Sequence, residues 1–261
     1  MKGWKQVKWA ILLFVLLAGF VMSLGAETQN PQGVTPGVEE KLGAFVPGDI
    51  QLRDEQGRLI RLGDLLDKPT ILNLGYFKCP GICSPLLSSL IEAVRGLDLQ
   101  PGVDYQVITV SIDHTEGPEL AREKKRNYLH SLPDYPPEQW PFLTGDSLNI
   151  ARLTRAVGFL FNKKGKDIAH PAAIVALSPD GKICRYIYGT EFLPFDLKMA
   201  ILESSKGKIG PSVARVLRFC FSYDPQGRKY VFNLLRVVGM GILISSLGFV
   251  ALIAYLSRKT G

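Results

Sequence analysis

The sequence predicts an α/β domain with a mixed central sheet, followed by a C-terminal transmembrane helix. Between residues 46 and 205, short apolar runs alternate with helix-like patterns, which is the order of elements in α/β folds. Near the end of this region, Ser178-Pro179-Asp180-Gly181 joins two apolar runs, and an Asp-Gly pair there is a strong β-hairpin signal. Residues 237–256 contain no charged side chain, and this length matches a helix that spans a membrane.

The elements of the domain are expected in a regular order. A first hairpin is expected where residues 50–53 and 59–62 alternate around a turn at Asp54-Glu55-Gln56-Gly57, and a short helical turn is expected at 63–66. Further strands are expected at residues 70–77, 105–112, 140–143, 173–177 and 182–188. Helices are expected at residues 84–96, 117–131, 146–157 and 194–205, with Asp146 or Ser147 as the N-cap of the third.

The chain carries further segments on either side of this domain. Lysines followed by an uncharged apolar run make residues 1–26 typical of a signal peptide or an N-terminal anchor. We expect a polar linker over residues 27–45, the folded domain over 46–205 and a basic juxtamembrane segment over 206–236. If Arg258 and Lys259 after the apolar stretch 237–256 lie inside, the domain lies on the outer, periplasmic side of the cytoplasmic membrane. Arg228, Lys229 and Arg236 on the other flank weaken this charge asymmetry, but they do not outweigh the expected export of the N-terminus.

Composition narrows the classes of function. The net charge is +7, but the basic residues form no stripe interleaved with aromatic side chains, so nucleic-acid binding is not predicted. Four cysteines are too few for a disulfide scaffold in a chain of 261 residues. No Cys-x-x-Cys-His sequence occurs, so covalent attachment of c-type haem is not supported.

Two of the cysteines lie where chemistry is expected. Cys79 and Cys83 follow the expected strand 70–77 and precede the expected helix 84–96. The positive end of the helix dipole, with Lys78 beside Cys79, favours the thiolate form of cysteine. The pair could form a disulfide or hold one soft metal ion, and it could also be purely structural, although so short a disulfide loop would stabilise little. Thiol–disulfide enzymes usually have two residues between their cysteines rather than three, which favours metal binding here.

His170 is the histidine that the topology could bring to these cysteines. It stands just before the expected strand 173–177, and if that strand neighbours the strand 70–77, its start faces the cysteine loop. Two thiolates and one imidazole form a soft donor set that suits Cu(I) and, with a weak additional ligand, Cu(II). Judged by ligand chemistry alone, zinc could also bind this donor set. The alternative interpretation is a surface histidine beside a proline.

The segment Tyr76–Pro85, with the sequence Tyr-Phe-Lys-Cys-Pro-Gly-Ile-Cys-Ser-Pro, resembles the copper-binding motif of the Sco/SenC copper chaperones. Those are membrane-tethered, thioredoxin-like proteins with a Cys-x-x-x-Cys pair and a distant histidine. The position of His170 ahead of the hairpin at 178–181, and the sequence Ser111-Ile112-Asp113, are also similar to the family. The resemblance covers residues 45–205. Many members of the family are anchored by an N-terminal helix, whereas this chain has a clear C-terminal apolar stretch.

The resemblance implies a thioredoxin-like fold and copper, as Cu(I), Cu(II) or both, held by Cys79, Cys83 and His170. It also implies a redox disulfide between Cys79 and Cys83. The expected partners are the CuA-bearing subunit of cytochrome c oxidase, other copper carriers and the membrane, and the expected function is metal delivery rather than catalysis. An alternative function is a thiol-disulfide reductase that keeps the cysteines of the oxidase copper site reduced. A peroxidase of the same fold is a third hypothesis, for which the sequence shows no local motif.

The other histidines and cysteines are given structural interpretations. His114 is expected in a loop, and His130 is expected in solvent at the end of an exposed helix. Cys184 alternates with Ile183 along the expected strand 182–188, which predicts that its side chain packs in the core or at the edge of the sheet. Cys220 is interpreted as a free thiol near the membrane surface, an intermolecular disulfide or a second metal ligand.

Overall fold

The structure is a computed structural model of the chain. It describes residues 36–79, 81, 83–165, 167–210, 221–224, 229–232, 238–239, 241–242 and 245–249. The predicted signal peptide or anchor over residues 1–26 lies outside the described residues.

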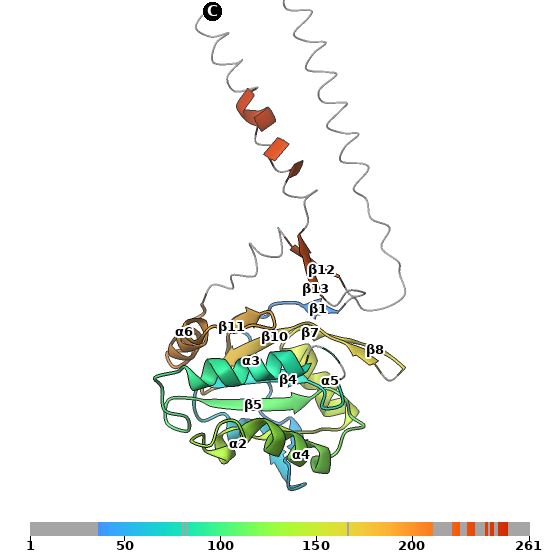
Figure 1. Cartoon of the computed structure of the whole chain (residues 1–261), viewed down its shortest axis with the longest axis vertical. Helices are drawn as coiled ribbons and strands as arrows, with labels where there is room; N and C mark the ends of the chain where they lie inside the picture. Colours follow the sequence, from blue (N-terminus) through green and yellow to red (C-terminus); the bar gives the residue numbers. More distant parts are fainter. Residues whose placement is uncertain are drawn as a thin grey trace, which may run out of the picture. The chain divides into compact units, whose positions relative to one another are not determined.

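Between residues 59 and 160 helices and strands alternate along the chain, as in α/β folds, and runs of consecutive strands stand on either side of this region (Figure 1). The strands are β1 (Gly37–Val38), β2 (Gln51–Arg53), β3 (Leu59–Arg61), β4 (Thr70–Gly75), β5 (Gln106–Ser111), β6 (Phe142–Leu143), β7 (Phe159–Leu160), β8 (Asn162–Lys164), β9 (Asp167–Ala169), β10 (Ala173–Leu177), β11 (Ile183–Tyr188), β12 (Phe221–Asp224) and β13 (Lys229–Phe232). The helices are α2 (Leu62–Leu65), α3 (Cys83–Arg95), α4 (Pro118–Leu129), the 3-10 helix η1 (Pro137–Gln139), α5 (Ser147–Ala156) and α6 (Pro194–Ser204).

The central sheet is mixed, as the sequence predicts. Its strand order is β11-β10-β4-β5-β6, in which β4, β5 and β6 are parallel and β10 runs antiparallel to both β4 and β11. The β10–β11 hairpin turns at Gly181, whose φ of 82° is readily adopted only by glycine. The first hairpin, β2–β3, and the N-cap Asp146, which accepts a hydrogen bond from the Asn149 amide at 2.8 Å, are likewise confirmed.

Both faces of the sheet are covered, which explains why its inner strands are continuous apolar runs in the sequence. Every residue of β4, β5 and β10 is buried. Successive side chains point to opposite faces, so Ile71 joins a core beneath α3, α4 and α6, while Leu72 joins a second core beside α5. Each fully buried aliphatic side chain of this kind contributes about 1.5–3 kcal/mol. The sheet is therefore a rigid base for the loops at the carboxyl end of β4.

The domain begins earlier than expected. Residues 36–45, assigned to the end of a linker, include β1, which pairs antiparallel with β7, and Phe45, which bridges to Lys182. The Glu39 amide donates to the Gly158 carbonyl at 2.8 Å, so this stretch is hydrogen-bonded to the domain. The strands β1, β7, β8 and β9 were not predicted, because they are only two or three residues long. The strands β1 and β7 pair with each other from distant parts of the chain, whereas β8 and β9 form a short local hairpin.

The C-terminal part contains a further hairpin, in which β12 and β13 pair antiparallel from Phe221↔Phe232 to Asp224↔Lys229. It falls within the predicted basic segment 206–236. Residues 238–239, 241–242 and 245–249 are helical, and the rest of the predicted transmembrane helix 237–256 lies outside the described residues. Within the described part of the chain, no helix reaches the length and apolar character needed to cross a membrane. That helix stays a prediction.

Candidate metal centre

The cysteine loop is formed where β4 ends and α3 has not yet begun. The Ile112 amide donates to the Gly75 carbonyl at 2.7 Å, which extends the pairing of β5 with β4 to its last residue. Beyond Gly75 the chain turns, and the Cys79 amide donates back to the Tyr76 carbonyl at 3.2 Å. Cys79 is half-buried, while the neighbouring Lys78 is exposed.

His170 reaches the same place from the opposite direction. Because β10 is antiparallel to β4, with Ile174 opposite Asn73, the start of β10 lies beside the end of β4. His170 stands three residues before β10 begins, and it is only 2% exposed. The prediction that this strand pairing would bring His170 to the cysteine loop is confirmed.

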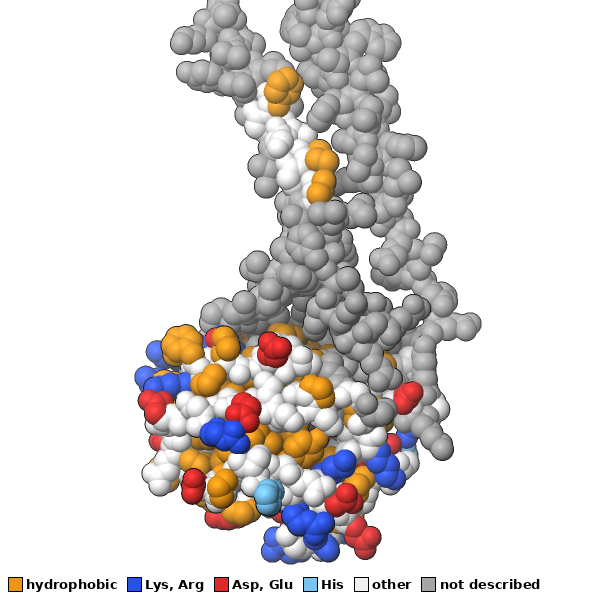
Figure 2. Space-filling model, in the orientation of Figure 1, with side chains coloured by type: hydrophobic (Ala, Val, Ile, Leu, Met, Phe, Trp, Pro, Cys, Tyr) orange, Lys and Arg blue, Asp and Glu red, His pale blue; other side chains and the backbone are white. Residues whose placement is uncertain are grey.

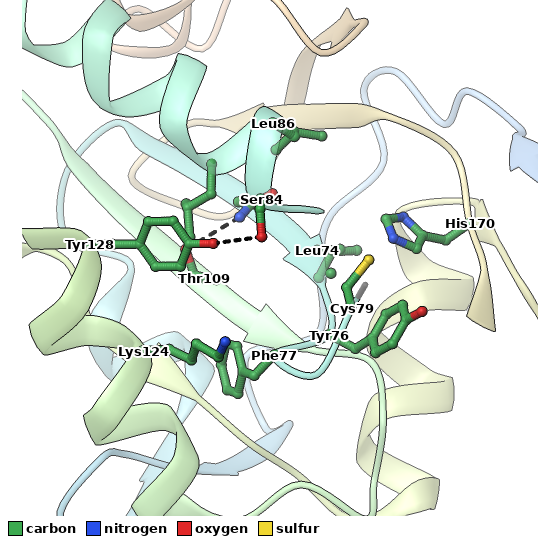
Figure 3. A pocket seen from close by; sticks show the side chains of 13 residues that line it. Leu74, Tyr76, Phe77, Cys79, Ser84, Leu86, Thr109, Lys124, Tyr128 and His170 are labelled. Atoms are coloured by element: carbon green, nitrogen blue, oxygen red, sulfur yellow. Dashed lines mark hydrogen bonds between the residues drawn. The ribbon is translucent and has the colours of Figure 1, made fainter. Parts of the chain in front are cut away.

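Cys79 and His170 line one pocket, and in Figure 3 the sulfur of Cys79 points toward the imidazole ring. The pocket encloses about 410 Å³, including the part that opens to solvent. Its other walls come from β4, the loop, α3, β5 and α4, and the lining includes Asn73, Leu74, Phe77, Ser84, Leu86, Leu87, Thr109, Lys124 and Tyr128. Together with the segment that carries His170, six parts of the fold therefore line the pocket.

The ring of His170 is held by its surroundings. Its Nδ1 lies 3.0 Å from the Pro171 carbonyl oxygen, and since a carbonyl can only accept, Nδ1 carries the proton in that hydrogen bond. This tautomer places the lone pair on Nε2, which is how metal-binding histidines are commonly prepared. The ring packs edge-on against Tyr76 and stacked on Phe159, with centroid separations of 5.9 Å in both cases.

The third predicted ligand, Cys83, is the first residue of α3, and its side chain is not among those described. Among the side chains that are described, no three from His, Cys, Asp or Glu form a group that could hold a metal ion. The structure thus brings two of the three predicted residues together. The complete ligand set stays a prediction.

The remaining cysteines and histidines are placed as follows. Cys184 is fully buried in β11, and its thiol donates to the Lys182 carbonyl at 3.5 Å, which confirms the packing interpretation. His114 lies exposed in the loop after β5, and His130 is exposed at the C-cap of α4, both as expected. Cys220 lies outside the described residues.

Two carboxylates lie near the site: Glu116, which the sequence analysis missed, and Asp113, which it noted only as part of the family resemblance. Glu116, 4% exposed, accepts hydrogen bonds from the Phe77 and Lys78 amides, both at 2.7 Å. Asp113 pairs with Lys163 at 2.9 Å. Burial by itself would raise the pKa of Asp113, but hydrogen bonds from Lys163 and Thr115 and the charge of Lys163 outweigh it, so the pKa lies below its ordinary value. Glu116 stands in a polar loop where the sequence contains no sign of its burial.

Acidic and basic side chains are mixed on the face of the domain over α3 and α4 (Figure 2). Close to the pocket, Lys124 and Tyr128 approach from α4, and the Tyr128 hydroxyl donates to Ser84 at 3.0 Å (Figure 3). Periodicity indicates which face of α4 is polar, but it does not show that Lys124 and Tyr128 line this pocket.

Fold and site together define a thioredoxin-like protein: a mixed sheet, a cysteine-bearing loop after a central strand, and a helix that begins at the second cysteine. The sequence model of the SCO1/SenC family matches residues 38–201. This chain therefore belongs to the SCO1/SenC family.

Individual relatives agree with this assignment. Protein SCO2 homolog, mitochondrial, of Bos taurus is 28% identical over 177 residues, which are 65% of this chain and 64% of the bovine protein. A solved structure from Aquifex aeolicus is 30% identical, with a TM-score of 0.58, and the match covers 64% of this chain and 95% of that one. Arabidopsis thaliana ScoI, solved with copper bound, shares the fold at 21% identity and a TM-score of 0.52, over 62% of this chain and 98% of that one.

The chain thus matches less than two thirds of the length of the bovine relative. The solved structure of BsSco, which shares the fold at 20% identity and a TM-score of 0.52, is described as that of a member of the Sco family of cytochrome c oxidase assembly proteins. The predicted family and the predicted thioredoxin-like fold are confirmed.

Proposed function

We propose that this protein is a membrane-tethered copper chaperone that binds copper through Cys79, Cys83 and His170 and delivers it to the CuA centre of cytochrome c oxidase. The observation that carries the proposal is that Cys79 and His170 line one pocket, although Cys79 follows β4 and His170 precedes β10. Sulfur and imidazole nitrogen are ligands that copper prefers. The family's copper-binding members support the choice of metal.

The chemistry follows from these ligands. The two thiols release their protons when copper binds, and the neutral imidazole of His170 supplies a nitrogen donor. Because Cys79 is half-buried rather than enclosed, an incoming ligand from a partner could replace one donor at a time, so copper would pass without being released to solvent. Oxidation of both thiols by an external disulfide, which takes up the two electrons and two protons and becomes two thiols, would form a Cys79–Cys83 disulfide and remove both sulfur ligands.

The proposed location is the outer face of the cytoplasmic membrane, with residues 237–256 as the tether and 1–26 as a signal peptide or second anchor. The partners proposed are the CuA-bearing oxidase subunit and other copper carriers. The uncharged length of residues 237–256 supports the tether, and Arg258 and Lys259 after it support the orientation.

A second candidate function is a thiol-disulfide reductase acting on the oxidase cysteines. The observation that favours it is the position of Cys83 at the first residue of α3, since helix N-termini stabilise thiolates. The two functions share the cysteines and differ in their need for His170.

The test uses the full chain in detergent, reduced and free of metal. Cu(I), Cu(II) and Zn²⁺ are titrated against competing chelators, and visible spectra are recorded for the thiolate-to-Cu(II) band. We expect one copper per chain, and we expect His170→Ala to weaken copper binding by more than about tenfold, since even outer-shell changes cost that much. Disulfide reductase activity should be largely retained in His170→Ala and lost in Cys79→Ala and Cys83→Ala.

His130→Ala is the matched control, because His130 is exposed at the end of α4 and should leave copper affinity unchanged. Equal loss of copper binding and reductase activity in His170→Ala would contradict the division of roles. Absence of tight copper binding by the wild type, together with an easily reduced Cys79–Cys83 disulfide, would make the reductase the leading function.

A further inference from the structure

The segment 111–116, which consists of the last residue of β5 and the loop after it, contacts both segments that carry the proposed ligands. Its first contact is made by Glu116. One carboxylate oxygen accepts the Phe77 amide at 2.7 Å and the Ser111 hydroxyl at 2.6 Å, and the other accepts the Lys78 amide at 2.7 Å. Such charge-assisted hydrogen bonds are about twice as strong as neutral ones.

These amides belong to the two residues directly before Cys79. Their hydrogen bonds determine the path of the backbone between the end of β4 and the start of α3, and therefore the direction in which Cys79 leaves the loop. Figure 3 shows the consequence, since Phe77 and Cys79 point to opposite sides of the loop, with Cys79 on the side of His170. Phe77 is itself buried and stacks on Phe142, with 5.9 Å between ring centroids.

The second contact of the loop is made by Asp113. Its carboxylate accepts from Lys163 Nζ at 2.9 Å and from the Thr115 amide and hydroxyl at 3.1 and 2.8 Å. Lys163 lies on β8 opposite Ile168 of β9, and β9 ends directly before His170. The ion pair therefore ties the β8–β9 hairpin, which leads into His170, to the same loop.

The loop that makes both contacts is internally fixed. The Asp113 amide donates to the Ser111 hydroxyl at 3.1 Å, and the Glu116 amide donates to the Asp113 carbonyl at 3.0 Å. Ser111 is fully buried as the last residue of β5, so the loop is attached to the central sheet. One short rigid segment thus holds the backbone before Cys79 and the hairpin before His170.

We propose that residues 111–116 act as a positioning brace, in which Glu116 sets the place of Cys79 and Asp113, through Lys163, sets the place of His170. The inference rests on the proposed copper site for its functional meaning. Groups that orient metal ligands from outside the first coordination shell commonly change metal affinity by about 10- to 100-fold when they are mutated. Neither carboxylate is a proposed ligand.

Two variants remove the two contacts separately. In Glu116→Gln the side chain keeps its shape, but its NH₂ group cannot accept, so at least one of the Phe77 and Lys78 amides loses its acceptor. In Lys163→Met the ion pair to Asp113 is removed. Ser111→Ala removes one donor to Glu116 and also the acceptor of the Asp113 amide, so it weakens the attachment of both contacts to β5. Asp54→Asn is the matched control, because Asp54 is also a buried carboxylate that accepts two backbone amides, but in the β2–β3 turn.

Two measurements are made on the full chain in detergent: amide hydrogen exchange of the metal-free reduced protein, and copper affinity by chelator competition. For Glu116→Gln we expect exchange at Phe77 and Lys78 to become at least about tenfold faster and copper affinity to fall about 10- to 100-fold. For Lys163→Met we expect faster exchange at Ile168 and a smaller loss of affinity. Asp54→Asn should change neither quantity at these positions.

The outcomes separate the brace from the proposed function. Faster exchange with unchanged copper affinity would overturn the brace as a positioning device, and unchanged exchange in both Glu116→Gln and Ser111→Ala would show that the contact does not hold the loop. If the wild type binds no copper, the proposed function fails. The brace is then judged by exchange and by the reduction potential of the Cys79–Cys83 pair, which Glu116→Gln should shift and Asp54→Asn should not.

Discussion

A substitution at Gly158 tests the packing of Phe159 against His170. It ends the turn after α5 and directly precedes Phe159, whose ring stacks on His170. Its φ is 61°, and a Cβ placed there would lie 1.8 Å from the Glu39 carbonyl oxygen. The substitution Gly158→Ala therefore creates both backbone strain and an overlap with another backbone segment that cannot rotate away.

The expected cost can be divided between these two effects. The left-handed conformation costs a residue with a Cβ about 1–2 kcal/mol. Relief of the overlap requires β1 to move from β7, which removes the hydrogen bond from the Glu39 amide to the Gly158 carbonyl and costs roughly another 0.5–1.5 kcal/mol. The total is about 1.5–3.5 kcal/mol, which for a domain of this size lowers Tm by roughly 3–14 °C.

Gly165→Ala is the control, because Gly165 has nearly the same φ, 63°, but its Cβ would meet no atom within 4 Å. It should show the conformational cost alone, about 1–2 kcal/mol. Urea denaturation and calorimetry of both variants measure the difference, and copper titration should show weaker binding in Gly158→Ala, since Phe159 moves with β1 and β7. Equal destabilisation by the two substitutions would refute the argument that the overlap with Glu39 matters.

Two further predictions concern acid stability and thiol reactivity. Burial alone would raise the pKa of Asp54, but hydrogen bonds from the Arg58 side chain and from the Arg58 and Gln56 amides outweigh it and hold the pKa below the ordinary 3.8. Asp54 therefore stabilises the fold above about pH 4, and this contribution is lost as the pH falls through the pKa of the folded state. We expect the difference in Tm between the wild type and Asp54→Asn to shrink between about pH 6 and pH 2. A difference in Tm that stays constant over this range would contradict the prediction. In the native reduced protein, an alkylating reagent should modify the half-buried Cys79 and leave the fully buried Cys184 intact until denaturant is added. Mass spectrometry measures the labelling of each cysteine, and labelling of Cys184 at the same rate as Cys79 would contradict the packing described for β11.

Much of the fold follows from local features of the sequence. The apolar runs that became β4, β5 and β10 and the Asp180-Gly181 turn between β10 and β11 depend on residues that are neighbours along the chain. The cap at Asp146 is equally local. The prediction that His170 would face the cysteine loop succeeded because it required only one long-range assumption, the pairing of β10 with β4.

The local sequence does not reveal the details that orient the site. The burial of Glu116, the ion pair between Asp113 and Lys163 and the stacking of Phe159 on His170 each join segments that are far apart in the chain. The strand β1 is too short to have a pattern of its own, and it exists because β7 supplies its hydrogen bonds. Residue types, hydrophobic period and turn chemistry thus determined the elements and the candidate ligands. Only packing in three dimensions decided which polar groups are buried together, because burial depends on what the rest of the chain places around each residue.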